Sequence, residues 1–299
     1  ASRAFRRPLT ESEASALRGL YQSLRDQELG HEQAIRLLIA RVFVSPAFLY
    51  RAEKPAARLS RAEQPPPPKD PALESHATPV SDRELATRLS FFLGSSVPDA
   101  ELRATAANAS LHEPETLLAQ TRRMLKEARV RRLATEFACQ WLHIYDFESH
   151  DEKSEAFFPT FADLRGAMYE ESIQFFTDLF QRDGSVLELI DADHTFLNEE
   201  LAKHYGIDGV TGPEWRRVDG VKQHGRGGIL GMATTLSKQS GASRTSPILR
   251  GNWVCEVLLG DKLPKPPKGV PLLPDVVPAG LTERQLIEKH SSDVACAKC

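Results

Sequence analysis

Two cysteines near the end of the sequence carry its sharpest chemical signal. Cys296 and Cys299 are separated by two residues. A pair with this spacing can form the two thioether bonds of haem c, and the histidine directly after the second cysteine is then the proximal iron ligand. The same spacing also suits a disulfide, a redox-active dithiol or half of a zinc site. The sequence stops at Cys299, so we expect the proximal histidine to be missing from this chain.

The other two cysteines, Cys139 and Cys255, lie in apolar, helix-like surroundings. Free cysteines are often buried like small hydrophobic residues, so we expect two buried free thiols. A single disulfide between them is the alternative. No second Cys-x-x-Cys occurs to complete a zinc site, and we predict no metal site.

A second candidate site is the run Arg244-Thr245-Ser246-Pro247, which is followed by Arg250 and Gly251. Thr245 or Ser246 can cap a helix that has Pro247 in its first turn. Arg244 and Arg250 could then hold a carboxylate or another anion near that helix N-terminus. The simpler alternative is a capped helix with buried ion pairs.

The nine histidines give a weaker signal. None is paired with another at the i, i+4 spacing of a helical metal site, so ordinary hydrogen-bonded or surface histidines are expected. If a haem is attached at the cysteine pair, its distal ligand could be His290, Met232 or a residue outside this chain.

Acidic side chains gather at Asp191, Asp193, Glu199 and Glu200. A hydrolase would need two of these carboxylates to face each other across one cleft. The sequence alone identifies no catalytic residue, and whether the protein is an enzyme stays open.

The composition is that of a folded protein, with 299 residues, 41% hydrophobic side chains and a net charge of −3. The slightly negative charge argues against a dedicated nucleic-acid-binding protein. No run of 18 uncharged apolar residues occurs, so we expect no transmembrane segment. The first residues do not resemble a signal peptide, and if the protein is exported we expect its signal upstream of this segment.

Helical patterns dominate the sequence, so we predict a mainly α fold of helical modules with few short strands. Three predicted helices start with a capping box, in which Thr or Ser precedes Glu or Gln by three positions. An amphipathic helix is expected over residues 161–180 with an acidic exposed face that includes Glu171. A further helix candidate covers residues 226–237, and Asn198 is expected to cap a helix that ends at Gly206. The capping pairs are Thr10 with Glu13, Ser81 with Glu84 and Thr282 with Gln285.

Proline-rich stretches divide these helices into groups. Residues 54–79 hold seven prolines and are expected to form a semi-rigid linker. We therefore predict a small helical module over residues 1–53, a central helical module over 80–213 and a third module over 214–299.

Several stretches together resemble the large planctomycete-type multidomain exported proteins of unknown function that contain a cytochrome-c-like module. The resemblance covers nearly the whole chain as three consecutive modules, the last of them the cytochrome-c-like one. The stretches are Arg3–Thr10, His194–Glu199 with His204–Gly206, and Arg244–Pro247 with Arg250–Gly251.

This resemblance implies that Cys296 and Cys299 attach haem c in a longer protein. It also implies a periplasmic or otherwise extracytoplasmic location, and electron transfer or another haem-dependent redox role with a redox partner protein or with other domains of the same polypeptide. The alternative is a non-catalytic helical scaffold that binds an exported protein or a glycan.

Overall fold

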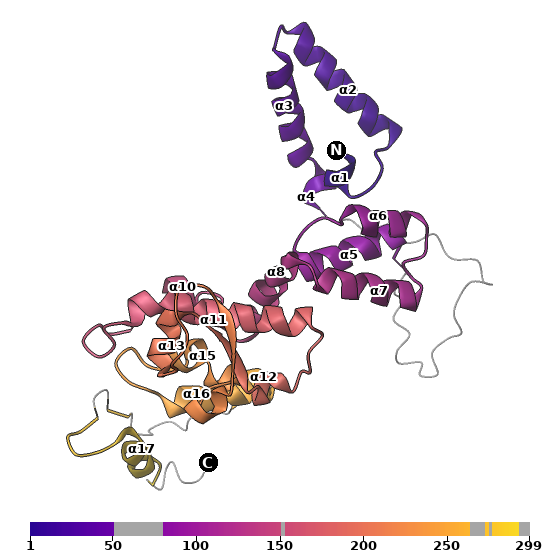
Figure 1. Ribbon diagram of the computed structural model, residues 1–299. Helices are drawn as coiled ribbons and strands as arrows, with labels where there is room; N and C mark the ends of the chain where they lie inside the picture. Colours follow the sequence, from indigo (N-terminus) through magenta and orange to yellow (C-terminus); the bar gives the residue numbers. More distant parts are fainter. Residues whose placement is uncertain (51–79, 151–152, 264–272, 275–276, 293–299) are drawn as a thin grey trace. The chain divides into compact units, whose positions relative to one another are not determined.

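The computed structural model describes residues 1–50, 80–150, 153–263, 273–274 and 277–292 (Figure 1). The described chain is mainly α-helical, as predicted, with one sheet of two short strands. It divides into two compact units, one formed by residues 1–133 with 180–183 and the other by 134–179 with 184–299. Among the described residues, no helix is both long and apolar enough to cross a membrane.

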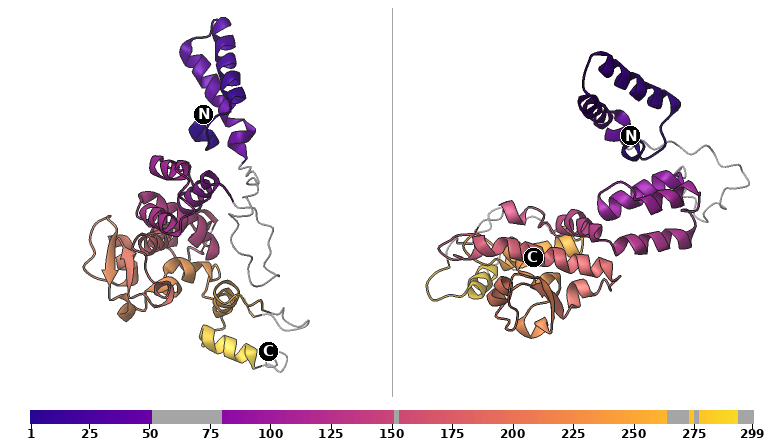
Figure 2. Two further views of the ribbon diagram at one scale, coloured as in Figure 1. Left: turned by 90° about the vertical axis from the view of Figure 1, so that its right-hand side faces the viewer. Right: turned by 45° about the horizontal axis from the view of Figure 1, so that its top comes forward.

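The first unit begins with an antiparallel helical hairpin, which Figure 2 presents from two further sides. Thr10 caps its first long helix through the predicted capping box, since its hydroxyl accepts from the backbone N–H of Glu13 at 3.2 Å and its own N–H donates to the Glu13 carboxylate at 2.9 Å. The Arg6 guanidinium donates to the carbonyl of Ala47 at 3.1 Å, which ties the start of the hairpin to its end. The helices are α1 (Ser2–Phe5), α2 (Glu11–Asp26), α3 (His31–Phe43) and α4 (Pro46–Leu49).

The rest of the first unit is a small helical bundle with its own core. Leu102 and Leu111 are completely buried there, and Phe180 packs against the same cluster. The Ser81–Glu84 capping box starts α5, as predicted. The elements are α5 (Asp82–Gly94), α6 (Ala100–Ala107), α7 (Pro114–Leu125), η2 (Ala128–Val130) and α8 (Arg131–Leu133).

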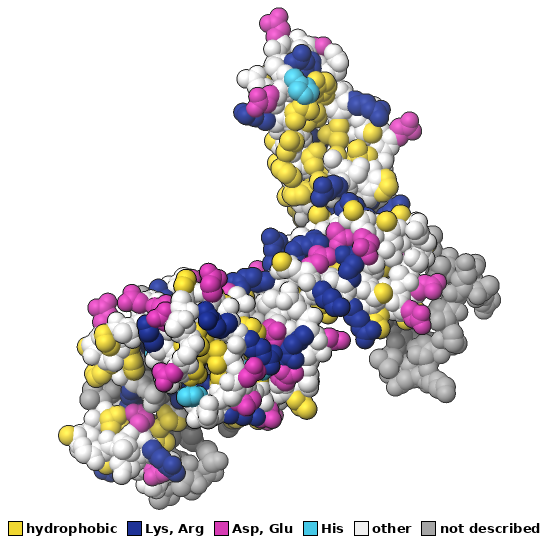
Figure 3. Space-filling view, viewed as in Figure 1, with side chains coloured by type: hydrophobic (Ala, Val, Ile, Leu, Met, Phe, Trp, Pro, Cys, Tyr) yellow, Lys and Arg dark blue, Asp and Glu magenta, His cyan; other side chains and the backbone are white. Residues whose placement is uncertain are grey.

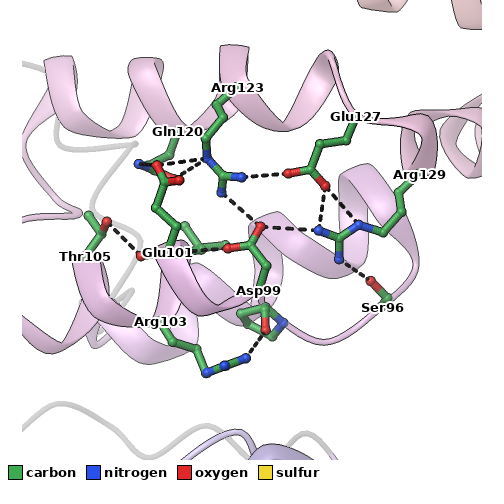
Figure 4. Close-up of polar contacts among 11 residues, drawn as sticks. Ser96, Asp99, Glu101, Arg103, Thr105, Gln120, Arg123, Glu127 and Arg129 are labelled. Atoms are coloured by element: carbon green, nitrogen blue, oxygen red, sulfur yellow. Dashed lines mark hydrogen bonds and ion pairs between the residues drawn. The ribbon is translucent and has the colours of Figure 1, made fainter.

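An ion-pair network holds α6, α7 and η2 together (Figure 4). The Asp99 carboxylate caps α6 by accepting from the backbone N–H of Leu102 at 2.8 Å, and it accepts from Arg123 at 2.9 Å. Arg123 and Arg129 also pair with Glu127, at 2.6 and 2.5 Å. Burial of Asp99 opposes its ionisation, but the Leu102 N–H and Arg123 outweigh this and lower its pKa. Since both cations have carboxylate partners, the network is structural.

The second unit is built around residues 161–179 of α11 (Phe161–Gln181), which are buried at positions from Phe161 to Leu179. Two indole groups fasten the later helices to the earlier ones: Trp253 donates to the carbonyl of Leu142 at 3.1 Å, and Trp141 donates to that of Val257 at 3.3 Å. The other elements are η3 (Ala134–Ala138), α9 (Cys139–Trp141), α10 (Phe147–His150), α12 (Glu188–Asp191), β1 (His194–Leu197), α13 (Glu199–Tyr205), β2 (Arg216–Asp219), η4 (Val221–His224), α14 (Gly228–Gly231), α15 (Ala233–Lys238), α16 (Pro247–Trp253), η5 (Val254–Leu258) and α17 (Glu283–Ser291).

The only sheet among the described residues pairs β1 with β2 antiparallel, with Thr195 opposite Val218. The predicted module boundary between residues 213 and 214 therefore falls in the connection between two paired strands. Asn198 caps α13, and Gly206 ends it in the left-handed conformation, as predicted.

Two helix predictions need correction. The expected exposed acidic face of α11 is wrong at Glu171, because that side chain is 1% exposed. The helix expected over residues 226–237 is two short helices, α14 and α15, which are separated at Met232, where the backbone is extended.

Candidate functional site

The two arginines of the predicted anion site have different surroundings in the structure. The Ser246 hydroxyl caps α16 by accepting from the N–H of Leu249 at 3.2 Å. Of the two predicted capping residues, Thr245 and Ser246, the cap is therefore Ser246. Arg244 lies 3.5 Å from the carboxylate of Glu283, which opens α17. Arg250, on α16, lines a cavity of about 290 Å³, whereas Arg244 is not part of its lining.

The cavity is mainly apolar and is assembled from segments that are distant in the sequence. Three buried side chains of α11 form one wall, and the segment before α11 adds two exposed aromatic rings. The rest of the lining comes from the end of α13, from α15, from the loop after α15 and from α16. The lining residues are Lys153, Phe157, Phe158, Pro159, Thr160, Phe161, Leu164, Met168, His204, Leu236, Ser237, Ser240, Gly241, Thr245 and Arg250.

Arg250 is held in this wall by one edge of its guanidinium group. Its Nη2 donates to the carbonyl of Leu236 at 3.1 Å and contacts the hydroxyl of Ser240 at 3.2 Å. Its Nε is buried, and among the described residues neither Nε nor Nη1 has a hydrogen-bond partner. Burial lowers the pKa of Arg250, and no described carboxylate pairs with it. The cavity thus contains a cation that lacks a counter-ion in the described part of the chain.

Two further titratable side chains line the cavity. Burial lowers the pKa of His204 below its ordinary value, and the nearby Arg226 lowers it further. Both effects favour the neutral form of the ring, which offers a hydrogen bond and no charge. The ammonium group of Lys153 lies 5.8 Å from the centre of the Phe161 ring, within range of a cation–π interaction.

A second polar cluster in the same unit is closed to solvent. The carboxylate of Glu171 accepts from the Thr195 hydroxyl at 2.6 Å and from the Tyr205 hydroxyl at 2.5 Å. The Tyr205 oxygen in turn accepts from the backbone N–H of Ala233 at 3.0 Å. The guanidinium of Arg226 lies 3.9 Å from the centre of the Tyr205 ring. The cluster connects α11, β1, α13 and α15 through one carboxyl group.

The electrostatics of this cluster are dominated by burial. Burial raises the pKa of Glu171 to about 7, although Thr195, Tyr205 and Arg226 each act to lower it. Burial and the neighbouring Glu171 raise the pKa of Tyr205. Both carboxylate oxygens have hydrogen-bond donors, and Glu171 does not line the cavity. We therefore interpret the cluster as structural.

Of the residues suggested for haem binding, the structure describes only the candidate distal ligands. Cys296 and Cys299 lie outside the described residues. Among the suggested distal ligands, Met232 is 1% exposed and its sulfur accepts from the Ser172 hydroxyl at 3.5 Å, so it would have to leave the core to reach an iron atom. His290 is half-buried in the last turn of α17. Within the described part of the chain, no group of three or more His, Cys, Asp or Glu residues could hold a metal ion.

The acidic residues between 191 and 200 do not form a catalytic pair. Asp191 pairs with Lys222 at 2.5 Å, and Asp193 accepts from the backbone N–H of Lys222 at 2.8 Å. Glu199 pairs with Lys203 on its own helix at 2.5 Å. Asp191 and Asp193 both contact Lys222, and Glu199 pairs within its own helix. None of these acids lines the described cavity, so the hydrolase alternative loses its structural basis.

Neither Cys139 nor Cys255 forms a disulfide, and only Cys139 is fully buried. The prediction of two free thiols is therefore confirmed, while the burial of Cys255 is incomplete.

Sequence reasoning missed most of the cavity and all of the buried cluster. Arg250 stood out because it follows a capping pattern, but nothing in the local spacing marked the aromatic pair Phe157-Phe158 as a cavity wall. His204 and Tyr205 could have been singled out as a polar pair at the end of a short capped helix.

Comparisons with known proteins find three family models that match consecutive parts of the chain. Residues 1–53 match PSD5, residues 80–207 match PSD4 and residues 226–299 match PSCyt3. Each is described as a protein of unknown function, under the names DUF1595, DUF1592 and DUF1588 respectively. No curated protein and no solved structure matches the chain. Cys296 and Cys299 lie within the part that matches PSCyt3.

Proposed function

The chain belongs to the planctomycete-type multidomain proteins that contain a cytochrome-c-like module, and from this premise we propose that it is an electron-transfer or haem-dependent redox component of an exported protein. Cys296 and Cys299 would attach haem c in the longer polypeptide, and a histidine after Cys299 would be the proximal ligand. A haem bound there supplies one-electron redox chemistry.

The observation that carries this proposal is the position of the Cys-x-x-Cys pair inside the match to PSCyt3. Two cysteines with this spacing are ambiguous alone, but a cytochrome-c-like module is a context in which haem attachment is the expected use. Haem attachment to exported cytochromes takes place outside the cytoplasm, which motivates the proposed extracytoplasmic location.

The test uses the longer protein, extended beyond residue 299 and produced together with haem c maturation enzymes. We expect a denaturing gel to show covalent haem by peroxidase staining, and the absorption spectrum to show the bands of a c-type cytochrome. Cys296→Ala and Cys299→Ala should each weaken attachment, and Cys255→Ala is the control that should leave it intact. Absence of covalent haem in the unsubstituted protein would contradict the proposal.

A second candidate function, a non-catalytic helical binding module, is favoured by the surface of the N-terminal hairpin. Ala34 is the only buried residue of α3, while Leu37, Ile39 and Phe43 are 46%, 48% and 50% exposed. Figure 3 shows hydrophobic side chains gathered in a patch on the hairpin. Exposed apolar patches often mark protein contacts, so this surface suits an exported protein better than a glycan. This candidate would be supported if the protein carries no haem and binds a protein partner that its Leu37→Glu variant no longer binds.

A further inference from the structure

We propose that the cavity beside Arg250 is a binding site for a small organic molecule with one carboxylate group and an apolar, preferably aromatic, body. The site belongs entirely to the second unit and does not depend on haem. Nothing in the family descriptions assigns a ligand to it.

The charge of the lining indicates an anionic ligand. Its two charged residues, Arg250 and Lys153, are both cations, and none of the described lining residues is acidic. A partly buried guanidinium without a carboxylate partner is unfavourable, since buried charges are normally paired. Nη2 of Arg250 is already fixed by Leu236 and Ser240, while Nη1 has no described partner. A ligand carboxylate at Nη1 would supply the missing counter-ion through a charge-assisted hydrogen bond.

The apolar walls indicate what the rest of the ligand is. Phe161, Leu164 and Met168 present buried apolar side chains to the cavity, and Phe157 extends this surface at 66% exposure. Ligand pockets commonly combine such walls with a few polar groups that fix orientation. A volume of about 290 Å³ is at the lower end of the usual range for ligand pockets and suits a single ring with a short side chain.

The polar groups favour a carboxylate over a phosphate. A phosphate dianion is usually held by several donors, often from more than one cation or from a row of backbone N–H groups. Here the second cation, Lys153, already has other partners, among them the Phe161 ring, so only one guanidinium edge is open. Ser237 and Thr245 add only hydroxyl groups. Inorganic phosphate alone would also leave the apolar walls without a partner.

The experiment is isothermal titration calorimetry of the 299-residue chain at pH 7 with three probes: 3-phenylpropanoate, its neutral amide 3-phenylpropanamide, and inorganic phosphate. We expect 3-phenylpropanoate to bind, and the amide to bind at least about tenfold more weakly because it lacks the charge. We expect no measurable binding of phosphate. Equal affinity for acid and amide, phosphate binding as tight as that of the acid, or no binding of the acid at millimolar concentration would overturn the proposal.

Variants then locate the site. Arg250→Met should weaken binding of the acid at least about tenfold and leave the weak binding of the amide unchanged. Arg284→Gln is the matched control, because Arg284 is an exposed arginine on α17 that pairs only with Glu288 in the described chain. If Arg250→Met does not fold, Phe157→Ala serves instead, since it changes an exposed ring and should weaken acid and amide alike. Unchanged binding in Phe157→Ala would also overturn the proposal.

Discussion

One buried carboxyl group holds four segments of the second unit together. Glu171 is the only acidic residue among the buried polar side chains of the described chain, and both of its oxygens accept from hydroxyl groups. The helical periodicity of the sequence predicted that Glu171 lies on an exposed face of α11. Such a pattern identifies the buried face reliably only when the opposite face of the helix is exposed to solvent. α11 is covered on more than one side, so a polar residue there needs partners instead of solvent.

The raised pKa of Glu171 makes stability depend on pH. Its pKa is about 7 in the folded protein, against an ordinary value of 4.5. The folded state therefore keeps a proton that the unfolded state loses between these values, and the stabilisation present below pH 4.5 is lost as the pH rises through 7. We expect the free energy of unfolding of the second unit to fall by about 2.5 kcal/mol between pH 5 and pH 8 through this group.

Urea unfolding of the wild type and of Glu171→Gln, followed by tryptophan fluorescence, measures this effect. The wild type should lose stability relative to Glu171→Gln as the pH rises. Glu170→Gln, one position along the same helix, is the control and should keep the wild-type slope. Parallel pH curves for wild type and Glu171→Gln would show that the carboxyl is ionised at all these pH values.

Among the elements, those with local signals were predicted well. The capping boxes at Thr10, Ser81 and Thr282 and the Asn198 cap all occur, because each depends on residues within one helical turn. The break at Met232 was not predicted, since its cause lies in tertiary structure. At the break, the backbone N–H of Ala233 donates to the Tyr205 hydroxyl of α13. Upstream, where α14 begins, the backbone at Gly227 and Gly228 passes against the carbonyls of α12 and of Ala192.

Gly227 should be irreplaceable where its backbone passes the carbonyl of Ala192. Its φ is +102°, and a Cβ atom there would lie 2.2 Å from the backbone oxygen of Ala192. The positive φ and the short distance to Ala192 each exclude a side chain at this position. We expect Gly227→Ala to destabilise the second unit by about 4 kcal/mol or more, or to prevent its folding.

Gly225→Ala is the matched control for this prediction. Gly225 also has a positive φ, of +68°, but a Cβ atom there meets open space. Its substitution should cost only about 1 kcal/mol, from the conformation alone. The two variants are compared by thermal unfolding, and similar melting temperatures would mean that the backbones of Gly227 and Ala192 do not approach each other as described.

For the molecule as a whole, the sequence predicted the class and the family better than the site. Arg250 was identified as a candidate because the capping pattern of its helix lies within a few residues. The cavity that Arg250 lines is formed by α11, α13, α15 and α16 together. The aromatic wall at Phe157 could not be assigned without knowing that the segment before α11 lies beside the loop after α15, where Ser154 donates its backbone N–H to Ala242 at 2.8 Å. Such contacts depend on tertiary packing and have no signature in spacing.

The division into two units predicts that they unfold separately. Each has a core of its own, with Leu102 completely buried in the first and Leu201 in the second. All three tryptophans, Trp141, Trp215 and Trp253, belong to the second unit, so tryptophan fluorescence reports on that unit alone, whereas far-ultraviolet circular dichroism reports on both.

Leu102→Ala should therefore destabilise the first unit by about 2–5 kcal/mol and lower the midpoint of part of the circular dichroism transition, while the fluorescence midpoint stays unchanged. Leu201→Ala, an equally buried leucine in the second unit, should lower the fluorescence midpoint by a comparable amount. Both variants are measured in the same urea titration with the two probes. If Leu102→Ala shifts the fluorescence midpoint as far as Leu201→Ala does, the two cores unfold as one cooperative system, and their independence is wrong.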